Sequence, residues 1–238
     1  MRLSTSAAFA CAVIVAMPCL VWAHGEARDA MAVLREAKAA AGGRAVDRHD
    51  ASYEEGRHGE TTYRTWLDLK HYGMKSESTH GGKTSTFGFN GKVAWTQTPD
   101  GAVTVKADAD SLREAITTAY ASNSGYFQPD LFPASFRYVR VARAQGRGFD
   151  VIEITPKDGR ATEYWFDRRT HLLGYIIDKD GRPAVAVEVS DNRDLDGERV
   201  GFHGKIRTLD GKLIEEMQVG SVVYKPLPSS TFDPPPAR

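Results

Sequence analysis

The side chains best suited to chemistry in this sequence are its histidines and one short acidic run. Metal ligands usually come from tightly grouped residues. The seven histidines are instead spread along the whole chain, at His24, His49, His58, His71, His80, His171 and His203. This spacing favours solvated or hydrogen-bonded imidazoles over a metal centre.

The acidic run, Asn192 to Gly197, imitates the first half of a calcium-binding loop through Asn192, Asp194 and Asp196. The twelfth position of such a loop carries a bidentate Glu, and here it is His203. Strand-like segments flank the run, whereas a calcium loop lies between helices. A hairpin turn rich in Asp and Gly is therefore the favoured interpretation, and no metal is predicted.

Motifs of the common enzyme classes are absent from the sequence. It contains no G-x-S-x-G, no H-E-x-x-H, no phosphate-binding loop, no dinucleotide fingerprint and no aspartic protease triplet. The neighbouring acids Glu215 and Glu216 would point to opposite faces of a strand, so they cannot share a proton. The sequence predicts a protein that is not an enzyme, with no catalytic residue and no cofactor.

The N-terminal segment has the pattern of a secretory signal peptide. Arg2 precedes an apolar run from Ala7 to Leu20, and Val21-Trp22-Ala23 places small residues where signal peptidase cleaves. The run is short and contains Pro18, which makes it a poor membrane span. Cleavage after Ala23 is favoured over an uncleaved anchor, so residues 1–23 are expected to be removed on export to the periplasm.

The predicted mature chain, residues 24–238, has the length and composition of one soluble domain. Both cysteines, Cys11 and Cys19, lie in the signal peptide, which excludes disulfides and thiolate sites from the rest. Apolar residues make up 41% of the sequence, enough for a packed core. Lys plus Arg equals Asp plus Glu, 31 against 31, so no nucleic-acid partner is expected.

Most of the mature sequence has the period of two that a half-buried strand requires. Val185, Val187 and Val189 alternate with other residues on the opposite parity. Turn residues such as Asn90-Gly91 and Asp210-Gly211 separate successive runs. The pattern predicts about ten antiparallel strands, mostly joined as hairpins.

Two segments change to the period of a helix. Residues Glu26–Ala41 are rich in alanine and end at Gly42-Gly43, a typical C-terminal stop. A second helix is expected near Asp110–Tyr120, where Ser111-Leu112-Arg113-Glu114 fits a capping box. The predicted fold class is mainly β (α+β), with two helical pieces beside the sheet.

Several predicted strands are apolar on both faces. Val151 faces opposite to Ile152 and Ile154, and Tyr164 faces opposite to Trp165. An antiparallel sheet with one solvated face should alternate cleanly between apolar and polar residues. The second face therefore needs a cover, which either helices or a bound apolar ligand would supply.

Large aromatic residues gather in two hairpins and in the helical insert between the strand-rich halves. They are the candidate ligand-binding residues: Trp66, Phe89, Trp95, Tyr120, Phe127, Phe132 and Trp165. In one interpretation Tyr120, Phe127 and Phe132 form a lid over an apolar pocket. In the other, these aromatic residues fill a core, which is the commoner role in a loop punctuated by Gly and Pro.

Three motifs resemble those of a known superfamily. Phe89 to Trp95, with the sequence FNGKVAW, is similar to the F-[DN]-G-x-x-x-W hairpin of bacterial lipoprotein-sorting proteins. Trp165-Phe166-Asp167 with Leu172-Leu173 resembles a second hairpin of these proteins, and Gly220 to Pro228 resembles their closing strand. The chain thus resembles the LolA/LolB-like superfamily of periplasmic lipoprotein and lipid carriers.

The resemblance implies an incomplete antiparallel β-barrel whose concave face is covered by helices and encloses a cavity for acyl chains. The predicted function is a periplasmic carrier for a lipid or an acylated lipoprotein. The alternative is a non-enzymatic interaction or sensor module of the cell envelope, with a filled core and an envelope protein as partner. A cavity of roughly 300 Å³ or more would favour the carrier.

Overall fold

A computed structural model describes residues 28–181 and 183–236 of the chain. The predicted signal peptide, residues 1–23, and both cysteines lie outside these residues, as does the predicted mature N-terminus His24. Within the described ranges, no helix has the length and apolarity needed to cross a membrane.

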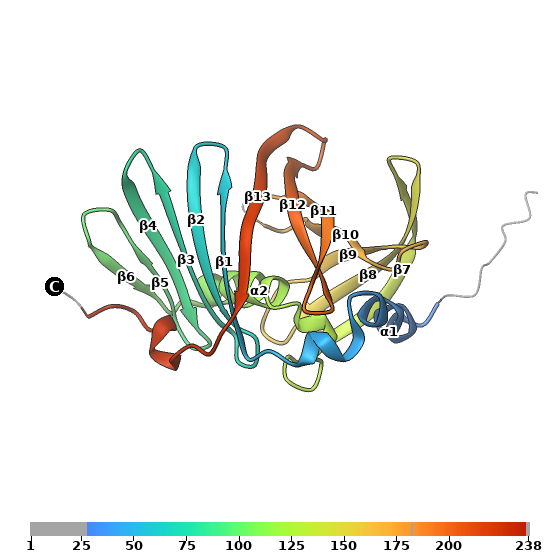
Figure 1. Ribbon diagram of the computed structural model, residues 1–238, viewed down its shortest axis with the longest axis horizontal. Coiled ribbons are helices and arrows are strands. Elements are labelled where there is room, and N and C mark those ends of the chain that lie inside the picture. The colour runs from blue at the N-terminus through green and yellow to red at the C-terminus, as the bar shows by residue number, and fades with distance from the viewer. Residues whose placement is uncertain (1–27, 182, 237–238) are drawn as a thin grey trace, which may run out of the picture.

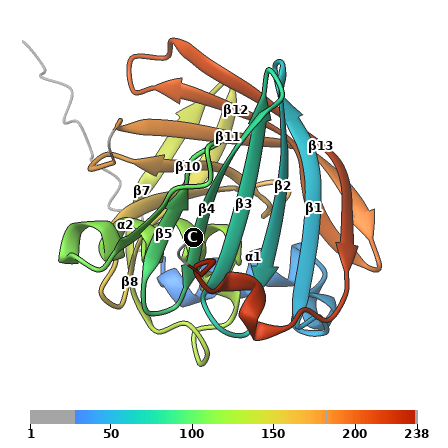
Figure 2. The same cartoon turned by 90° about the vertical axis from the view of Figure 1, so that its left-hand side faces the viewer.

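The described residues form one 13-stranded antiparallel sheet that bends around two helices (Figures 1 and 2). The spatial order is β6-β5-β4-β3-β2-β1-β13-β12-β11-β10-β9-β8-β7, so β6 and β7 are the edges and the sheet stays open. Its strands are β1 Ala51–His58, β2 Thr61–Asp68, β3 Gly73–His80, β4 Lys83–Asn90, β5 Ala94–Gln97, β6 Val103–Lys106, β7 Ala134–Ala144, β8 Arg147–Pro156, β9 Thr162–Asp167, β10 Leu173–Asp178, β11 Val185–Leu195, β12 Glu198–Thr208 and β13 Leu213–Tyr224.

The prediction of a mainly antiparallel, incomplete barrel is confirmed, but the predicted count of about ten strands is too low. Strand β1 explains part of the difference, because Glu54, Glu55 and Arg57 put polar groups on both of its parities. Strand β1 is defined instead by its backbone pairing with neighbouring strands. It lies between β2 and β13, with Ser52 opposite both Leu67 and Tyr224, and so joins the two halves of the sheet.

The hairpins form where turn residues predict them. Between β4 and β5, Gly91 adopts a φ of +85°, and the Asn90 side chain accepts hydrogen bonds from the backbone N–H groups of Lys92 and Val93. Between β11 and β12, Asp196 and Gly197 make a two-residue turn, with φ values of +53° and +85°. The calcium-like run therefore consists of the last residues of β11 and the expected hairpin turn at Asp196 and Gly197.

Helix α1, Ala30–Ala40, begins where the Asp29 side chain accepts a hydrogen bond from the Met31 N–H. It ends near Gly42, whose φ of +125° suits glycine and whose Cα faces the Gly197 carbonyl so closely that a Cβ would lie 2.3 Å from that oxygen. The Arg199 N–H also donates to the Ala41 carbonyl at 2.8 Å. The C-terminal end of α1 is thus attached to the turn between β11 and β12.

Helix α2, Ala109–Ser122, begins one turn before the predicted capping box. Its N-cap is Asp108, whose side chain accepts a hydrogen bond from the Ser111 N–H at 2.9 Å. Asp108 is the N-cap in place of Ser111 because its carboxylate accepts a hydrogen bond from a free backbone N–H. The negative charge also interacts favourably with the positive end of the helix dipole. The short 3-10 helices η1 Gly43–Asp47, η2 Gly125–Phe127 and η3 Ser229–Phe232 complete the fold.

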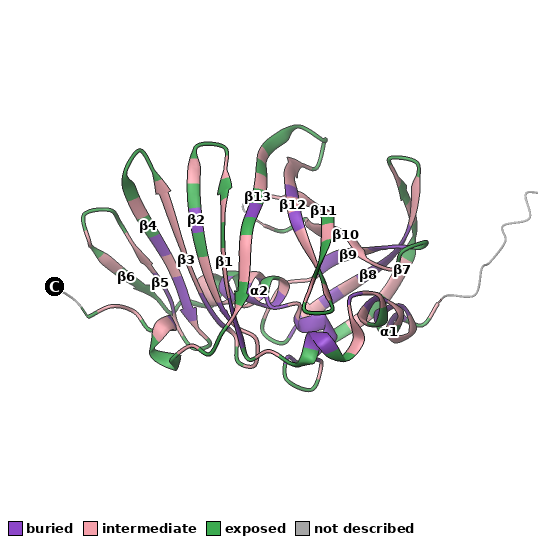
Figure 3. Cartoon of the chain, in the orientation of Figure 1, coloured by how far each residue is buried: buried purple, intermediate pink, exposed green. Residues whose placement is uncertain are grey.

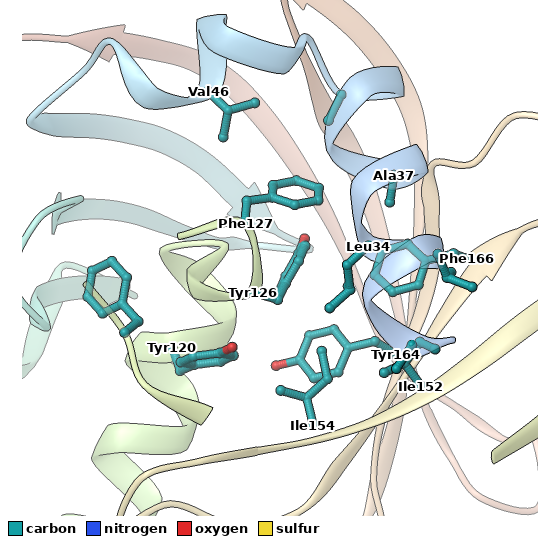
Figure 4. Packing of buried hydrophobic residues seen from close by; sticks show 14 residues of the cluster. Leu34, Ala37, Val46, Tyr120, Tyr126, Phe127, Ile152, Ile154, Tyr164 and Phe166 are labelled. Atoms are coloured by element: carbon teal, nitrogen blue, oxygen red, sulfur yellow. The ribbon is translucent and has the colours of Figure 1, made fainter. Parts of the chain in front are cut away.

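Two buried clusters hold the helices on the sheet. In the larger one, α1 and η2 pack on β8 and β9 through residues such as Leu34, Phe127, Ile152 and Phe166 (Figure 4). In the smaller one, α2 packs on β2 to β5 around Phe89. Figure 3 shows that the hairpin tips at the top of the sheet are exposed, so burial concentrates where the helices lie.

Trp95 lies on the other face of the sheet, under the C-terminal segment. Its side chain is 1% exposed, and its indole N–H donates to the Phe232 carbonyl in η3 at 2.9 Å. Gly88 provides the space, because a Cβ there would lie 2.1 Å from the indole ring. Trp95 therefore attaches the end of the chain to β4 and β5.

We predict that Trp95→Ala lowers the free energy of unfolding by about 3–5 kcal/mol, because a large buried ring is lost and the Phe232 carbonyl loses its donor. Urea unfolding measures this. Trp66→Ala, which removes a half-buried indole from β2, is the matched control and should cost about 1 kcal/mol. Equal losses in the two variants would contradict this account of η3.

Candidate functional site

A groove of about 770 Å³ lies between the helices and the strands that curve around them. Its strand side carries an aliphatic wall formed by Leu67, Met74, Ile176, Val185, Val187, Val189, Ile206, Met217 and Val219, and polar residues such as Ser76, Asp178 and His203 lie among them. Its helix side carries shorter side chains together with two aromatic rings: Ala37, Ala41, Thr117, Ala121, Tyr126 and Phe127. The groove is therefore an apolar space bounded by both layers of the fold.

Side chains alternate between the two faces of each strand, and this alternation determines which residues form the aliphatic wall. Val185, Val187 and Val189 share one face of β11, as their spacing of two requires. Pairing with β12 puts Ile206 opposite Val187 and Gly204 opposite Val189, so the wall continues across neighbouring strands. These valines are only half buried by the protein itself. Their apolar surface is thus available to a ligand.

Glu54 and Glu198 put carboxyl groups in the groove, and a tyrosine hydroxyl donates to each one. The donor to Glu54 is Tyr63, at 2.6 Å, and the donor to Glu198 is Tyr224, at 2.5 Å. Burial raises the pKa of both glutamates and outweighs the opposing effect of the tyrosine hydrogen bonds. The groove therefore favours the uncharged form of these acids.

Arg160 holds α2 against the sheet at one end of the groove. Its guanidinium pairs with Glu114 of α2 and, at 2.7 Å, with Asp178 of β10. Its backbone N–H donates to the Thr117 hydroxyl at 2.8 Å. The hydrogen bond to Glu114 is the main cause of the raised pKa of Arg160. This ion pair fixes one edge of the helical cover while leaving the aliphatic wall uncovered.

The seven aromatic residues predicted to bind a ligand lie in different environments. Phe127 lines the groove. Tyr120 and Phe132 are fully buried beside it in the larger cluster, and Phe89 is buried under α2. Trp95 is covered by η3. The insert thus contributes both to the wall and to the packed core behind it.

Trp66 and Trp165 lie on the face of the sheet away from the groove. Trp66 alternates with Thr65 and Leu67, which line the groove, and contacts Tyr53 and Lys75 instead. Trp165 packs with Phe149 and Tyr175. Both indoles sit in aromatic and cationic clusters of the outer face.

The aliphatic residues of β10 to β13 were not among the candidates from the sequence. The signal that identifies them was present, because the alternation around Val187 already defines one apolar face. In this fold the alternation, and not the size of the aromatic residues, marks the groove wall. For the histidines, no three His, Cys, Asp or Glu side chains among the described residues are grouped so that they could hold a metal ion.

Comparison of the sequence with family models gives no match, and comparison with curated proteins gives none either. Solved structures do match. A DUF1329 family protein from Desulfovibrio piger superposes with a TM-score of 0.55 at 15% identity, over 86% of this chain and 97% of that one. A LolA superfamily protein from Nitrosomonas europaea gives 0.52 at 12% identity, over 87% and 98%.

A third structure, a domain from Vibrio parahaemolyticus assigned to outer membrane lipoprotein sorting, gives a TM-score of 0.55 at 13% identity, over 86% of this chain and 97% of that one. The chain has the LolA/LolB-like fold. The three matched structures share this fold across nearly their whole length. The resemblance seen in the sequence motifs is therefore confirmed at the level of the fold.

We predict that Glu54→Gln gains stability relative to the wild type as pH rises. The pKa of Glu54 is raised above the ordinary value of 4.5, so the folded state holds this proton more tightly than the unfolded state. The protonated Glu54 therefore stabilises the folded state fully below pH 4.5, and this stabilisation is lost as the pH rises through the pKa of Glu54 in the folded protein. Glutamine stays neutral and avoids this loss.

Urea unfolding of both proteins between about pH 4 and about pH 8 measures the difference. Glu60→Gln, in the exposed turn after β1, removes the same charge and serves as the control. If the difference in the free energy of unfolding between Glu54→Gln and the wild type does not change with pH, the prediction is contradicted.

Proposed function

We propose that the protein is a non-enzymatic carrier or binding protein for an apolar ligand, a lipid or the acyl chain of a lipoprotein. The observation that carries the proposal is the groove of about 770 Å³ with its aliphatic wall. Small-molecule sites are typically about 300–1,000 Å³ and mostly apolar, with a few polar groups. The groove has this size, and its aliphatic wall offers the apolar surface that such a ligand needs.

The binding energy would come from hydrocarbon burial. Each buried CH₂ contributes about 0.8 kcal/mol, so about ten methylenes provide roughly 8 kcal/mol before the costs of ordering the ligand. Phe127 on the helix side and Val187 on the strand side would contact opposite sides of the bound hydrocarbon. No polar chemistry is needed for useful affinity.

The alternative, an interaction or sensor module with a filled core, requires that side chains occupy the space between helices and strands. Alanine and threonine on the helices are too short to do so opposite Val187 and Ile176. The groove therefore supports the carrier over the filled module. An envelope protein remains a second kind of partner, as the source or acceptor of the ligand.

We further propose that residues 1–23 are a cleaved signal peptide, that residues 24–238 are one domain, and that the protein works in the periplasm. The apolar run that ends at Ala23 supports export. The assignment of the matched Vibrio domain to outer membrane lipoprotein sorting fits the same compartment. N-terminal sequencing of exported protein should find His24 first, and a start at Met1 would argue against cleavage.

We predict that Val187→Asp weakens binding of an apolar fluorescent probe by about tenfold or more, because it places a carboxylate in the aliphatic wall. Val223→Asp is the matched control: the same change on β13, where the valine is 48% exposed and outside the groove. Probe titration and thermal melting on both variants measure the effect. Equal probe affinities in folded Val187→Asp and Val223→Asp, or no binding by the wild type, would refute the carrier.

A further inference from the structure

Two buried hydroxyl groups beside the groove lack hydrogen-bond partners among the residues that the structure describes. They belong to Tyr120 of α2, which is 0% exposed, and Thr162 of β9, which is 3% exposed. Native proteins pair nearly all buried polar groups, because an unpaired one keeps the full cost of leaving water. Each of these groups therefore calls for a functional explanation.

These hydroxyls belong to a larger group, here called the hydroxyl cluster, that consists of Tyr120, Tyr126, Thr162 and Tyr164. Figure 4 shows the Tyr120 and Tyr164 hydroxyls pointing toward one another from α2 and β9. The rings of Tyr126 and Tyr164 are 5.2 Å apart, and the Tyr126 hydroxyl has only a long contact, 3.4 Å, to the Ser124 hydroxyl. The Tyr120 and Tyr164 hydroxyls thus face one another in a largely apolar region, and the Tyr126 hydroxyl points away from them toward Ser124.

The hydroxyl cluster borders the groove. Thr162 and Tyr126 line it directly. Tyr164 lies two residues after Thr162 on the same face of β9 and packs on Tyr126. Thr162 and Tyr126 thus border the groove, whereas Tyr120 and Tyr164 lie buried beside them.

All three tyrosines of the cluster remain protonated donors at physiological pH. Burial raises the pKa of Tyr120 and Tyr164, and the neighbouring tyrosines raise it further. Burial likewise raises the pKa of Tyr126 to about 12. The cluster can thus donate to an oxygen atom but cannot neutralise a cation.

The charged groups nearest the cluster disfavour an anion. Asp178 lies close enough to Tyr164 to raise the pKa of that tyrosine, and it shares its cation, Arg160, with Glu114. A carboxylate or phosphate buried there would lose its hydration and meet like charge. An uncharged acceptor avoids both costs.

We propose that the hydroxyl cluster binds an uncharged oxygen acceptor on the ligand, the carbonyl of an acyl ester, while the hydrocarbon lies in the groove. The proposal rests on the proposed function and narrows its ligand class from any apolar molecule to an esterified acyl chain. The unpaired hydroxyls reduce the stability of the free protein and become satisfied when the ester carbonyl enters.

The test compares the full-length mature chain with Tyr120→Phe and Thr162→Val, which remove a hydroxyl and keep the shape. Without ligand, both variants should melt at or above the wild-type temperature, because an unpaired buried group is removed. Tyr63→Phe is the matched control. It also lines the groove, but its hydroxyl donates to Glu54, so its loss should lower the melting temperature.

Displacement of a bound apolar dye by methyl dodecanoate, dodecanoate or tridecane then measures the ligand class. We expect the wild type to bind the ester more tightly than the acid at neutral pH. Tyr120→Phe and Thr162→Val should each weaken ester binding by about fivefold and leave tridecane binding unchanged.

Unchanged ester binding in both variants, or tighter binding of dodecanoate than of the ester, would overturn the inference while leaving an apolar carrier intact. If none of the three compounds displaces the dye, or no dye binds, the proposed function itself fails. A fall in the melting temperature of Tyr120→Phe and Thr162→Val as large as that of Tyr63→Phe would also overturn the inference, since it would show that the hydroxyls are already paired.

Discussion

Short side chains on the covering helices determine how much of the sheet's apolar face is filled. Ala37, Thr117 and Ala121 lie across the groove from residues such as Ile176 and Val187. Protein interiors are normally packed as densely as organic crystals, so a space of this size between two layers needs such a cause. Larger helix residues would close the groove and turn the same fold into an ordinary two-layer core.

The helices keep their positions without filling the groove because they are attached near their ends. The C-terminal end of α1 is hydrogen-bonded to β12, because the Arg199 N–H donates to the Ala41 carbonyl. The Lys38 side chain of α1 also donates to the Phe127 carbonyl at 2.9 Å. Arg160 joins the first half of α2 to β10. These contacts add to the packing of the two buried clusters, and they leave the aliphatic wall accessible.

Two sets of polar groups in and beside the groove differ in their hydrogen-bond partners. The carboxyl groups of Glu54 and Glu198 each accept a hydrogen bond from a tyrosine, so the protein satisfies part of their hydrogen-bonding capacity itself. The hydroxyls of Tyr120 and Thr162 have no such partner in the described part of the chain. The first set is satisfied within the protein, and the second is the feature by which the groove can distinguish one apolar molecule from another.

The sequence by itself determined most strands, the two helices and the hairpin turns, because periodicity and turn chemistry act over a few residues. It predicted strands from Ala51 onward but named none over β1, because polar side chains on both parities hide a strand that only pairing with β2 and β13 defines. It also placed Trp66, Trp95 and Trp165 in the pocket. The strands of Trp66 and Trp165 carry large apolar residues on both faces, so alternation separates the faces without saying which one lies inside the curve. Only the curvature of the complete sheet, and the helices packed on one side of it, decided that Val187 faces the groove and Trp165 faces away.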